Sequence, residues 1–365
     1  MSSLILFFYV FVIATSPHAA TKDQGSEADA LLKWKSSLDN HSKALLSSWI
    51  GNNPCGWEGI TCDYKSKSIN KVNLTNIGLK GTLQSLNLSS LSKIHTIVLK
   101  NNFLYGVVPH HIGEMSSLKT LDFSVNNLSE SIPPSIGNLT NLNTIDLSQN
   151  NFSGPIPFTI GSMTKLSTLS LFSNSLTGQI PPSIGNLINL DTISIYLNDN
   201  KLSRPIPSTI RNLTILNTLY LYLNALTGQI PPSIGNLINL DTIWLSQNNL
   251  SGPIPFTIGT MTKLSTLSLY SNSLTGQIPP SIGNLINLDT TYLDDNKLSG
   301  PNPSTIRNLT KLNTLYLYLN ALTGQIPPSI GNLINLDTIY LTLNNLSRPI
   351  PSTIGNLTKL SALDL

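Results

Sequence analysis

Charged residues are scarce in this chain. Only 11% of its 365 residues are Asp, Glu, Lys or Arg, and 21 basic against 18 acidic side chains give a formal net charge of +3. This balance indicates neither a nucleic-acid-binding patch nor an acidic tail. The composition therefore gives no reason to expect a nucleic acid among the partners.

Cysteine is scarcer still, with two residues, Cys55 and Cys62, in a loop-like segment. A zinc site would need two further ligands, and no histidine lies nearby at ligand spacing. In an oxidising compartment the two thiols can pair, so we expect a Cys55–Cys62 disulfide and no metal site. Nothing in the sequence indicates a cofactor.

Long apolar runs are missing apart from L-I-L-F-F-Y-V-F-V-I-A at residues 4–14. A helix of that length cannot cross a hydrocarbon layer about 30 Å thick. The run is followed by small residues, which is typical of a secretory signal peptide, although the start, Met-Ser-Ser, carries no Lys or Arg. We therefore predict a signal peptide at residues 1–20 and no membrane span in this chain.

Catalytic signatures are missing as well. None of the five histidines has a plausible Ser or Cys partner in fixed geometry, and kinase motifs such as H-R-D and D-F-G do not occur. We expect no catalytic residue in this chain and do not predict an enzyme.

One phrase dominates the rest of the sequence. Between Ile69 and Lys359 the pattern L-x-x-L-x-L-x-x-N-x-L-x-G-x-I-P restarts twelve times, nearly always after 24 residues, and Leu360 begins a truncated thirteenth copy. A fixed period of this size indicates a solenoid, in which each unit stacks on its neighbours and the stack presents a long curved surface. Residues 69–365 are predicted to form this array, and such surfaces bind other molecules. The repeats open at Ile69, Ile94, Leu118, Leu142, Leu166, Leu190, Leu216, Leu240, Leu264, Leu288, Leu312 and Leu336.

Each repeat has three predicted parts. The alternating L-x-x-L-x-L opening favours a short strand with Leu inward. The Asn eight residues after the opener, as at Asn150, can both donate and accept hydrogen bonds where the chain leaves the strand, and these amides should form a column. The Gly and Pro of G-x-I-P suit the bend back on the convex side.

The array departs from its consensus at a few places. The sixth repeat is 26 residues long, and we expect its two extra residues in a bulge or local register break around Ile193 to Asn200. Glu130, Arg204 and Arg348 replace the Gly of G-x-I-P, and Asn302 puts a polar group at an expected core position. Residues 141–238 and 239–334 are near copies of each other. A feature that both copies share is therefore one piece of evidence about function, not two.

A cap is predicted ahead of the array, at residues 21–68. Ala30, Leu31, Trp34 and Leu38 follow helical spacing, and Leu45, Leu46 and Trp49 indicate a second short helix before the loop C-G-W-E-G-I-T-C. Such a module shields the apolar end of the first repeat from water.

The L-x-G-x-I-P segments, together with the W-x-G-I-x-C of Trp57 to Cys62, carry a family resemblance. From about residue 25 onward the chain resembles plant extracellular leucine-rich-repeat proteins, above all the ectodomains of leucine-rich-repeat receptor-like kinases. The resemblance implies an α/β repeat solenoid, a right-handed superhelix with a concave parallel β-sheet, a second shorter sheet and a helical N-terminal cap. It also implies a cell-surface receptor for a peptide or other apoplastic signal, with a leucine-rich-repeat co-receptor kinase as partner. Full-length relatives carry a membrane helix and a Ser/Thr kinase.

The chain departs from that family at its end. It stops at Leu365 inside a predicted strand, without a second cysteine pair, a membrane helix or a kinase. We interpret it as a fragment or truncated product of a receptor-like kinase, exposed at the cell surface when complete and otherwise secreted to the apoplast. An alternative is a secreted protein similar to plant polygalacturonase inhibitors, which needs a C-terminal cysteine cap. A third is a structural or ice-ordering protein, because Thr holds the second position after the opener in eleven successive repeats; its plain role is to stabilise parallel strands.

The predicted ligand-binding residues lie on the concave face, to which the second, fourth and sixth positions after each opener should point. Exposed aromatic rings in a groove bury large areas at low entropic cost and are favoured at binding hot spots, although aromatic residues also stabilise strands in their own right. The predicted contacts are Phe172, Tyr220, Tyr222, Trp244, Tyr270, Tyr292, Asp294, Tyr316, Tyr318 and Tyr340.

Charges on this face are mostly negative. The acids in or beside the strands are Asp122, Asp146, Asp241, Asp289, Asp294, Asp295 and Asp337, against Lys100 and Lys119, and all four arginines lie outside the strands. Relatives that read a free carboxyl end use paired strand arginines, so the resemblance disfavours that mode. A neutral or cationic ligand fits better, although solvation alone could account for the acids.

Eleven N-x-S/T sequons are candidate glycosylation sites, although an Asn-rich repeat also generates them by chance. They lie at Asn40, Asn73, Asn87, Asn127, Asn138, Asn151, Asn212, Asn249, Asn308, Asn345 and Asn356.

Overall fold

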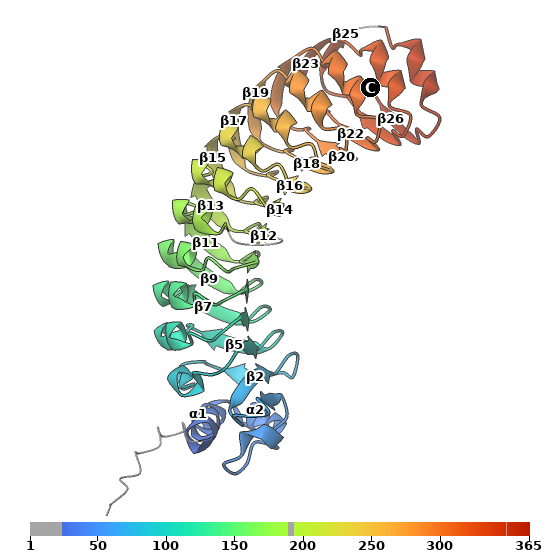
Figure 1. Ribbon diagram of the computed structural model, residues 1–365. Helices are drawn as coiled ribbons and strands as arrows, with labels where there is room; N and C mark the ends of the chain where they lie inside the picture. Colours follow the sequence, from blue (N-terminus) through green and yellow to red (C-terminus); the bar gives the residue numbers. More distant parts are fainter. Residues whose placement is uncertain (1–23, 189–192, 348) are drawn as a thin grey trace, which may run out of the picture.

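The structure, a computed structural model, describes residues 24–188, 193–347 and 349–365. The predicted signal peptide at residues 1–20 lies outside these ranges. The described chain forms a long arc of stacked coils, and the strands of its longer sheet follow the inner side of the arc (Figure 1). Within the described ranges no helix is long and apolar enough to span a bilayer.

Two α-helices, α1 (Gln24–Ser37) and α2 (Asn40–Leu45), form most of the cap. Three indole rings fill its interior: Trp49 lies between Trp34 and Trp57, with ring centroids 6.2 Å and 5.3 Å away. Each indole Nε1 donates to a backbone carbonyl, so burial leaves none of the three unpaired. The expected Cys55–Cys62 disulfide is present, with 5.4 Å between the Cα atoms.

The cap also closes the first edge of the sheet. Strand β1 (Ile60–Cys62) pairs antiparallel with β2 (Ile69–Asn73), the first strand of the array. The buried carboxylate of Glu27 accepts a hydrogen bond from the backbone N–H of Ile69 at 3.0 Å. An exposed sheet edge invites pairing with other chains, and the cap covers this one.

The longer sheet has 14 strands, and every pair after β1–β2 is parallel. Its strands are short because the apolar–polar alternation in each repeat covers only a few residues. After β1 and β2 they are β4 (Thr96–Val98), β6 (Thr120–Asp122), β8 (Thr144–Asp146), β10 (Thr168–Ser170), β12 (Ile193–Tyr196), β14 (Leu216–Tyr220), β16 (Thr242–Trp244), β18 (Thr266–Ser268), β20 (Thr290–Tyr292), β22 (Thr314–Tyr316), β24 (Thr338–Tyr340) and β26 (Ala362–Asp364).

A second sheet of 12 strands is built from the segments that precede I-P in each repeat. The resemblance implied this sheet, and the structure contains it. Its strands are β3 (Lys80–Gly81), β5 (Phe103–Gly106), β7 (Asn127–Ser131), β9 (Asn151–Pro155), β11 (Ser175–Gly178), β13 (Lys201–Arg204), β15 (Ala225–Gln229), β17 (Asn249–Pro253), β19 (Ser273–Gly276), β21 (Lys297–Gly300), β23 (Ala321–Gln325) and β25 (Asn345–Ser347).

The third part of each repeat is a 3-10 turn. In η4 (Pro134–Asn138) the N–H of Ile136 donates to the Pro133 carbonyl and that of Leu139 to the Ile136 carbonyl, at 2.9 Å and 3.1 Å. The turns stack so closely that a Cβ on Gly137 would overlap the Thr159 carbonyl of the next repeat. The predicted repeat solenoid with a parallel inner sheet and a helical cap is therefore confirmed, with single 3-10 turns as the helical element of the repeats.

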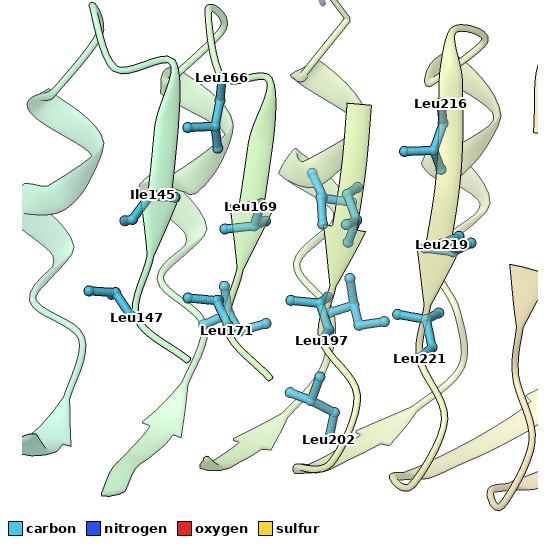
Figure 2. Close-up of a cluster of buried hydrophobic side chains, with 14 of the residues drawn as sticks. Ile145, Leu147, Leu166, Leu169, Leu171, Leu197, Leu202, Leu216, Leu219 and Leu221 are labelled. Atoms are coloured by element: carbon cyan, nitrogen blue, oxygen red, sulfur yellow. The ribbon is translucent and has the colours of Figure 1, made fainter. Parts of the chain in front are cut away.

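Buried Leu and Ile side chains form one continuous core along the array. Figure 2 shows Leu169, Leu171, Leu197, Leu219 and Leu221 at matching positions of successive strands. Each such side chain contributes about 1.5–3 kcal/mol on burial. Because its contacts lie in the adjacent repeats, this stabilisation depends on the neighbours.

The predicted asparagine column is present. Oδ1 of Asn150 accepts from the N–H of Leu128, and its Nδ2 donates to the carbonyls of Phe123, Leu147 and Ser148, at 2.9–3.2 Å. The same pattern recurs from Asn102 to Asn344. These amides satisfy backbone groups that no strand pairing reaches.

A register break lies in the sixth repeat, inside the range from Ile193 to Asn200 where the sequence predicted it. Ser194 pairs with both Thr168 and Thr218, and the register shifts between Ile193 and Ser194. From Ser194 to Asn200 the repeat is regular, and Asn200 occupies its usual place in the asparagine column. Ser194 therefore takes the second position of this repeat.

Candidate functional site

The fourth position after each opener places one side chain per strand along the inner sheet. Strand pairing places Tyr220 between Tyr196 and Trp244. Further along the sheet, Tyr292 lies between Ser268 and Tyr316. Tyr340 follows on the other side of Tyr316. These aromatic side chains are half-buried. The parallel register therefore turns a sequence period into a row of neighbouring rings.

The sixth position adds a second row. Tyr222 lies 5.3 Å from Trp244, and Tyr318 lies 6.2 Å from Tyr316 and 6.5 Å from Tyr340, as centroid distances. These separations are in the range of favourable aromatic pairs. We call the combined set the aromatic face: Phe172, Tyr196, Tyr220, Tyr222, Trp244, Tyr270, Tyr292, Tyr316, Tyr318 and Tyr340.

Sequence reasoning missed one member of this face, Tyr196. Its ring lies 5.2 Å from that of Tyr220 in an edge-to-face arrangement. The insertion in the sixth repeat obscured its position. The near-duplication offered a usable signal, because Tyr196 corresponds to Tyr292 in the second copy. Among the described residues Phe172, which was predicted, makes no ring contact with the other members.

Six side chains of this region line an open hollow of about 310 Å³. Its lining contains six of the ten predicted ligand-binding residues. The other four predicted residues lie outside the lining: Phe172, Tyr220, Tyr222 and Tyr340. None of the lining residues is basic. They are Trp244, Tyr270, Tyr292, Asp294, Tyr316 and Tyr318.

Asp294 is the unusual member of the hollow. Its side chain is only 3% exposed. Tyr318 lines the same hollow, and the Oδ1 atom of Asp294 has no hydrogen-bond partner. Burial raises the pKa of the Asp294 carboxyl. Burial, with the adjacent Asp294 charge, raises the pKa of Tyr318 to about 12, so this hydroxyl stays a donor at neutral pH.

The other predicted acids have local partners. Asp122 and Asp146 accept from the hydroxyls of Ser124 and Ser148. Asp241, Asp289 and Asp337 accept from the threonine hydroxyl that follows each of them, and Asp295 from Ser271. Among the seven acids Asp294 alone has a buried oxygen without a partner.

The candidate glycosylation sites leave the aromatic face clear. All eleven sequon asparagines are exposed. Asn73 ends strand β2, and none of the others lies on an inner-sheet strand. Glycans at these positions would project from the cap, the first strand of the array, the second sheet and the 3-10 turns.

The described residues contain no group of three or more His, Cys, Asp or Glu side chains that could hold a metal ion. The chemical groups that this region offers are aromatic rings, phenol hydroxyls and one unpaired carboxylate oxygen.

Known families match along most of the chain. Residues 68–222 match the leucine-rich repeat region family, and residues 24–63 match the leucine-rich repeat N-terminal domain. Four single leucine-rich repeats match at residues 216–237, 239–261, 263–285 and 311–333. A probable leucine-rich repeat receptor-like protein kinase of Arabidopsis thaliana is 41% identical over 116 residues, which are 30% of this chain and 10% of that protein.

Solved structures extend the similarity. The PEPR1–AtPEP1 structure matches with a TM-score of 0.80 and 33% identity over 93% of this chain and 51% of that one. The Arabidopsis receptor kinase HAESA, in complex with the peptide hormone IDA and the co-receptor SERK1, matches with a TM-score of 0.74 and 33% identity, over 93% of this chain and 61% of that one. The chain thus spans about a tenth of the curated relative and little more than half of the first solved ectodomains it matches.

Proposed function

Because this chain is a leucine-rich-repeat protein related to the ectodomains of plant leucine-rich-repeat receptor-like kinases, we propose that it is an extracellular recognition domain. Its ligand is a peptide or another small apoplastic signal, and the aromatic face binds it. The N-terminal cap and its disulfide suit an oxidising, extracellular setting. The domain acts at the outer side of the plasma membrane or in the apoplast.

The aromatic face carries this proposal. Tyrosine and tryptophan rings offer large contact areas at low entropic cost, and here they line the inner side of the arc with partial exposure. The sequons leave these strands free, so glycans would not cover them. A long row of rings suits an extended ligand better than a compact one.

Three further assignments belong to the same proposal. A leucine-rich-repeat co-receptor kinase is the expected partner, since HAESA was solved with the co-receptor SERK1.

The proposed domain organisation is a signal peptide at 1–20, a cap at 21–68 and the array at 69–365. The chain contributes recognition, and any kinase activity belongs to a separate domain of a longer protein.

A capture experiment tests the proposal. The secreted protein is immobilised, exposed to the peptide fraction of apoplastic fluid, and the retained peptides are quantified by mass spectrometry. The triple variant Tyr220→Ala, Tyr222→Ala and Trp244→Ala should lose peptides that the native chain retains. If this variant retains the same peptides in equal amounts, the ligand binds at a site other than the aromatic face.

A matched control removes three aromatic rings from outside the inner sheet. Phe103, Phe158 and Phe256 are 61%, 70% and 71% exposed and lie on β5 and at the first positions of η5 (Phe158–Ser162) and η9 (Phe256–Thr260). Changing all three to Ala should leave peptide retention unchanged. Both variants must match the native protein in secretion and thermal unfolding for the comparison to count.

A further inference from the structure

The near-duplication places the same constellation on the aromatic face twice. Tyr196, Asn198, Tyr220 and Tyr222 in the first copy correspond to Tyr292, Asp294, Tyr316 and Tyr318 in the second. The ring geometry repeats closely. Tyr196 and Tyr220 lie 5.2 Å apart at 69°, and Tyr292 and Tyr316 lie 5.1 Å apart at 72°.

The two copies differ in one chemical respect. Asn198 and Asp294 are 5% and 3% exposed, and each has a buried Oδ1 without a hydrogen-bond partner. The first is the oxygen of a neutral amide, whereas the second belongs to a group that can ionise. Three tyrosines thus recur around one uncharged and one acidic acceptor, whereas Trp244 and Tyr270 of the second copy correspond to Asp146 and Phe172 in the first.

A buried carboxylate oxygen without a donor is unfavourable, and a bound cation removes that penalty. Aromatic ring faces attract cations as well. The hollow of about 310 Å³ beside Asp294 is lined by five such rings, and its lining contains no basic side chain to neutralise the acid. We propose that this hollow binds the cationic end of a lysine or arginine side chain of the ligand. This inference rests on the proposed function, because the cation is taken to be part of the recognised peptide.

Trp244 adds a second unpaired group at the same place. It lines the hollow, and its buried indole Nε1 has no hydrogen-bond partner. An indole N–H can only donate, so it suits a backbone carbonyl of the peptide that carries the cation. Asp295, the neighbouring acid, is already hydrogen-bonded to Ser271 and does not compete for the cation.

The test uses the whole secreted protein and three blocked tripeptides, N-acetyl-Gly-Arg-Gly-amide and its Lys and Gln counterparts. Binding is followed by calorimetry and by tryptophan fluorescence, which reports on Trp244. The Arg or the Lys peptide should bind about tenfold or more tightly than the Gln peptide. Whichever cationic peptide binds more tightly identifies the preferred head group.

One variant isolates the charge. Asp294→Asn should reduce binding of the cationic peptide to that of the Gln peptide, and it should fold normally because Asn occupies the equivalent position 198. Equal affinity of the cationic peptide for the native and Asp294→Asn proteins, or no preference over Gln in the native protein, would overturn the proposal.

The outcome is separable from that of the capture experiment. If the aromatic triple variant loses apoplastic peptides while native and Asp294→Asn proteins retain them equally, the recognition face stands and the cation site fails. If the triple variant retains them, the broader proposal fails regardless of the tripeptide data.

Discussion

Tyr318 and Asp294, one repeat apart, line the same hollow, and the Asp294 charge helps to raise the pKa of Tyr318. The Oδ1 atom of Asp294 is buried and has no hydrogen-bond partner. An acid in this position makes both stability and binding depend on pH.

Burial raises the folded-state pKa of Asp294 above its ordinary value of 3.8. The folded state therefore holds the proton more tightly than the unfolded chain, and this stabilisation is complete below pH 3.8 and lost as the pH rises through the raised pKa. Asp294→Asn should increase the free energy of unfolding above that pKa and have little effect below pH 3.8. Urea unfolding at a series of pH values measures the difference, and a gap that does not change with pH would contradict the assignment.

Cation binding should show the opposite dependence. A cation pairs with the ionised carboxylate, so affinity for the Arg or Lys tripeptide should fall as the pH drops through the raised pKa of Asp294. Asp295, Tyr316 and Tyr318 also face this group; both tyrosines have raised pKa values and stay neutral in this range. Calorimetric titrations across this range should give a flat profile for Asp294→Asn.

Replacing a member of the asparagine column should be costly. Asn150→Ala leaves the buried N–H of Leu128 without an acceptor. The carbonyls of Phe123, Leu147 and Ser148 each lose one of two donors. The expected loss of stability is about 2 kcal/mol or more. Asn141→Ala removes an exposed amide that also links neighbouring repeats and should cost less than about 0.5 kcal/mol. Equal losses in chemical denaturation would show that the column has no special role.

Glu130 and Arg204 occupy a backbone conformation that suits glycine. The φ values of Glu130 and Arg204 are +64° and +73°. Gly154, at the place equivalent to Glu130 one repeat later, has a similar φ of +71°. A left-handed conformation costs a non-glycine residue about 1–2 kcal/mol. Glu130→Gly and Arg204→Gly should therefore each stabilise the protein by about 1 kcal/mol. Ser129→Gly, at a neighbouring residue outside that region, should not raise the melting temperature.

Asn302 stands where other repeats have a buried Ile, such as Ile206 and Ile326. It is 8% exposed, and its Oδ1 has no partner. Asn302→Ile should stabilise the protein by about 2 kcal/mol, because it removes an unsatisfied polar atom and adds apolar burial. The reverse change, Ile326→Asn, should destabilise by a similar amount or more. A lower melting temperature for Asn302→Ile would indicate that the amide has an unrecognised partner.

Much of the fold could be predicted because its determinants are periodic. A 24-residue repeat of Leu, Asn, Gly and Pro specifies strand, column and turn in each coil, and the asparagine bonds from Asn102 to Asn344 follow it. In the sixth repeat the predicted register break is present between Ile193 and Ser194, but a fixed count from the previous opener passed over Tyr196. The pattern of the core, not the count from the previous opener, decides the register there.

The amino-acid order alone specified the stacking and the inward row of aromatic residues, because these follow from a short period that every coil repeats. The cap was specified separately, by apolar residues at helical spacing ahead of the array. The burial of Asp294 was decided in three dimensions. Its place in the repeat is held by Tyr in some coils and by Thr342 in another, and only the packing of rings from adjacent strands leaves one acid enclosed with a free oxygen. The environment of a charge depends on neighbours that are distant in the chain, and no local pattern encodes it.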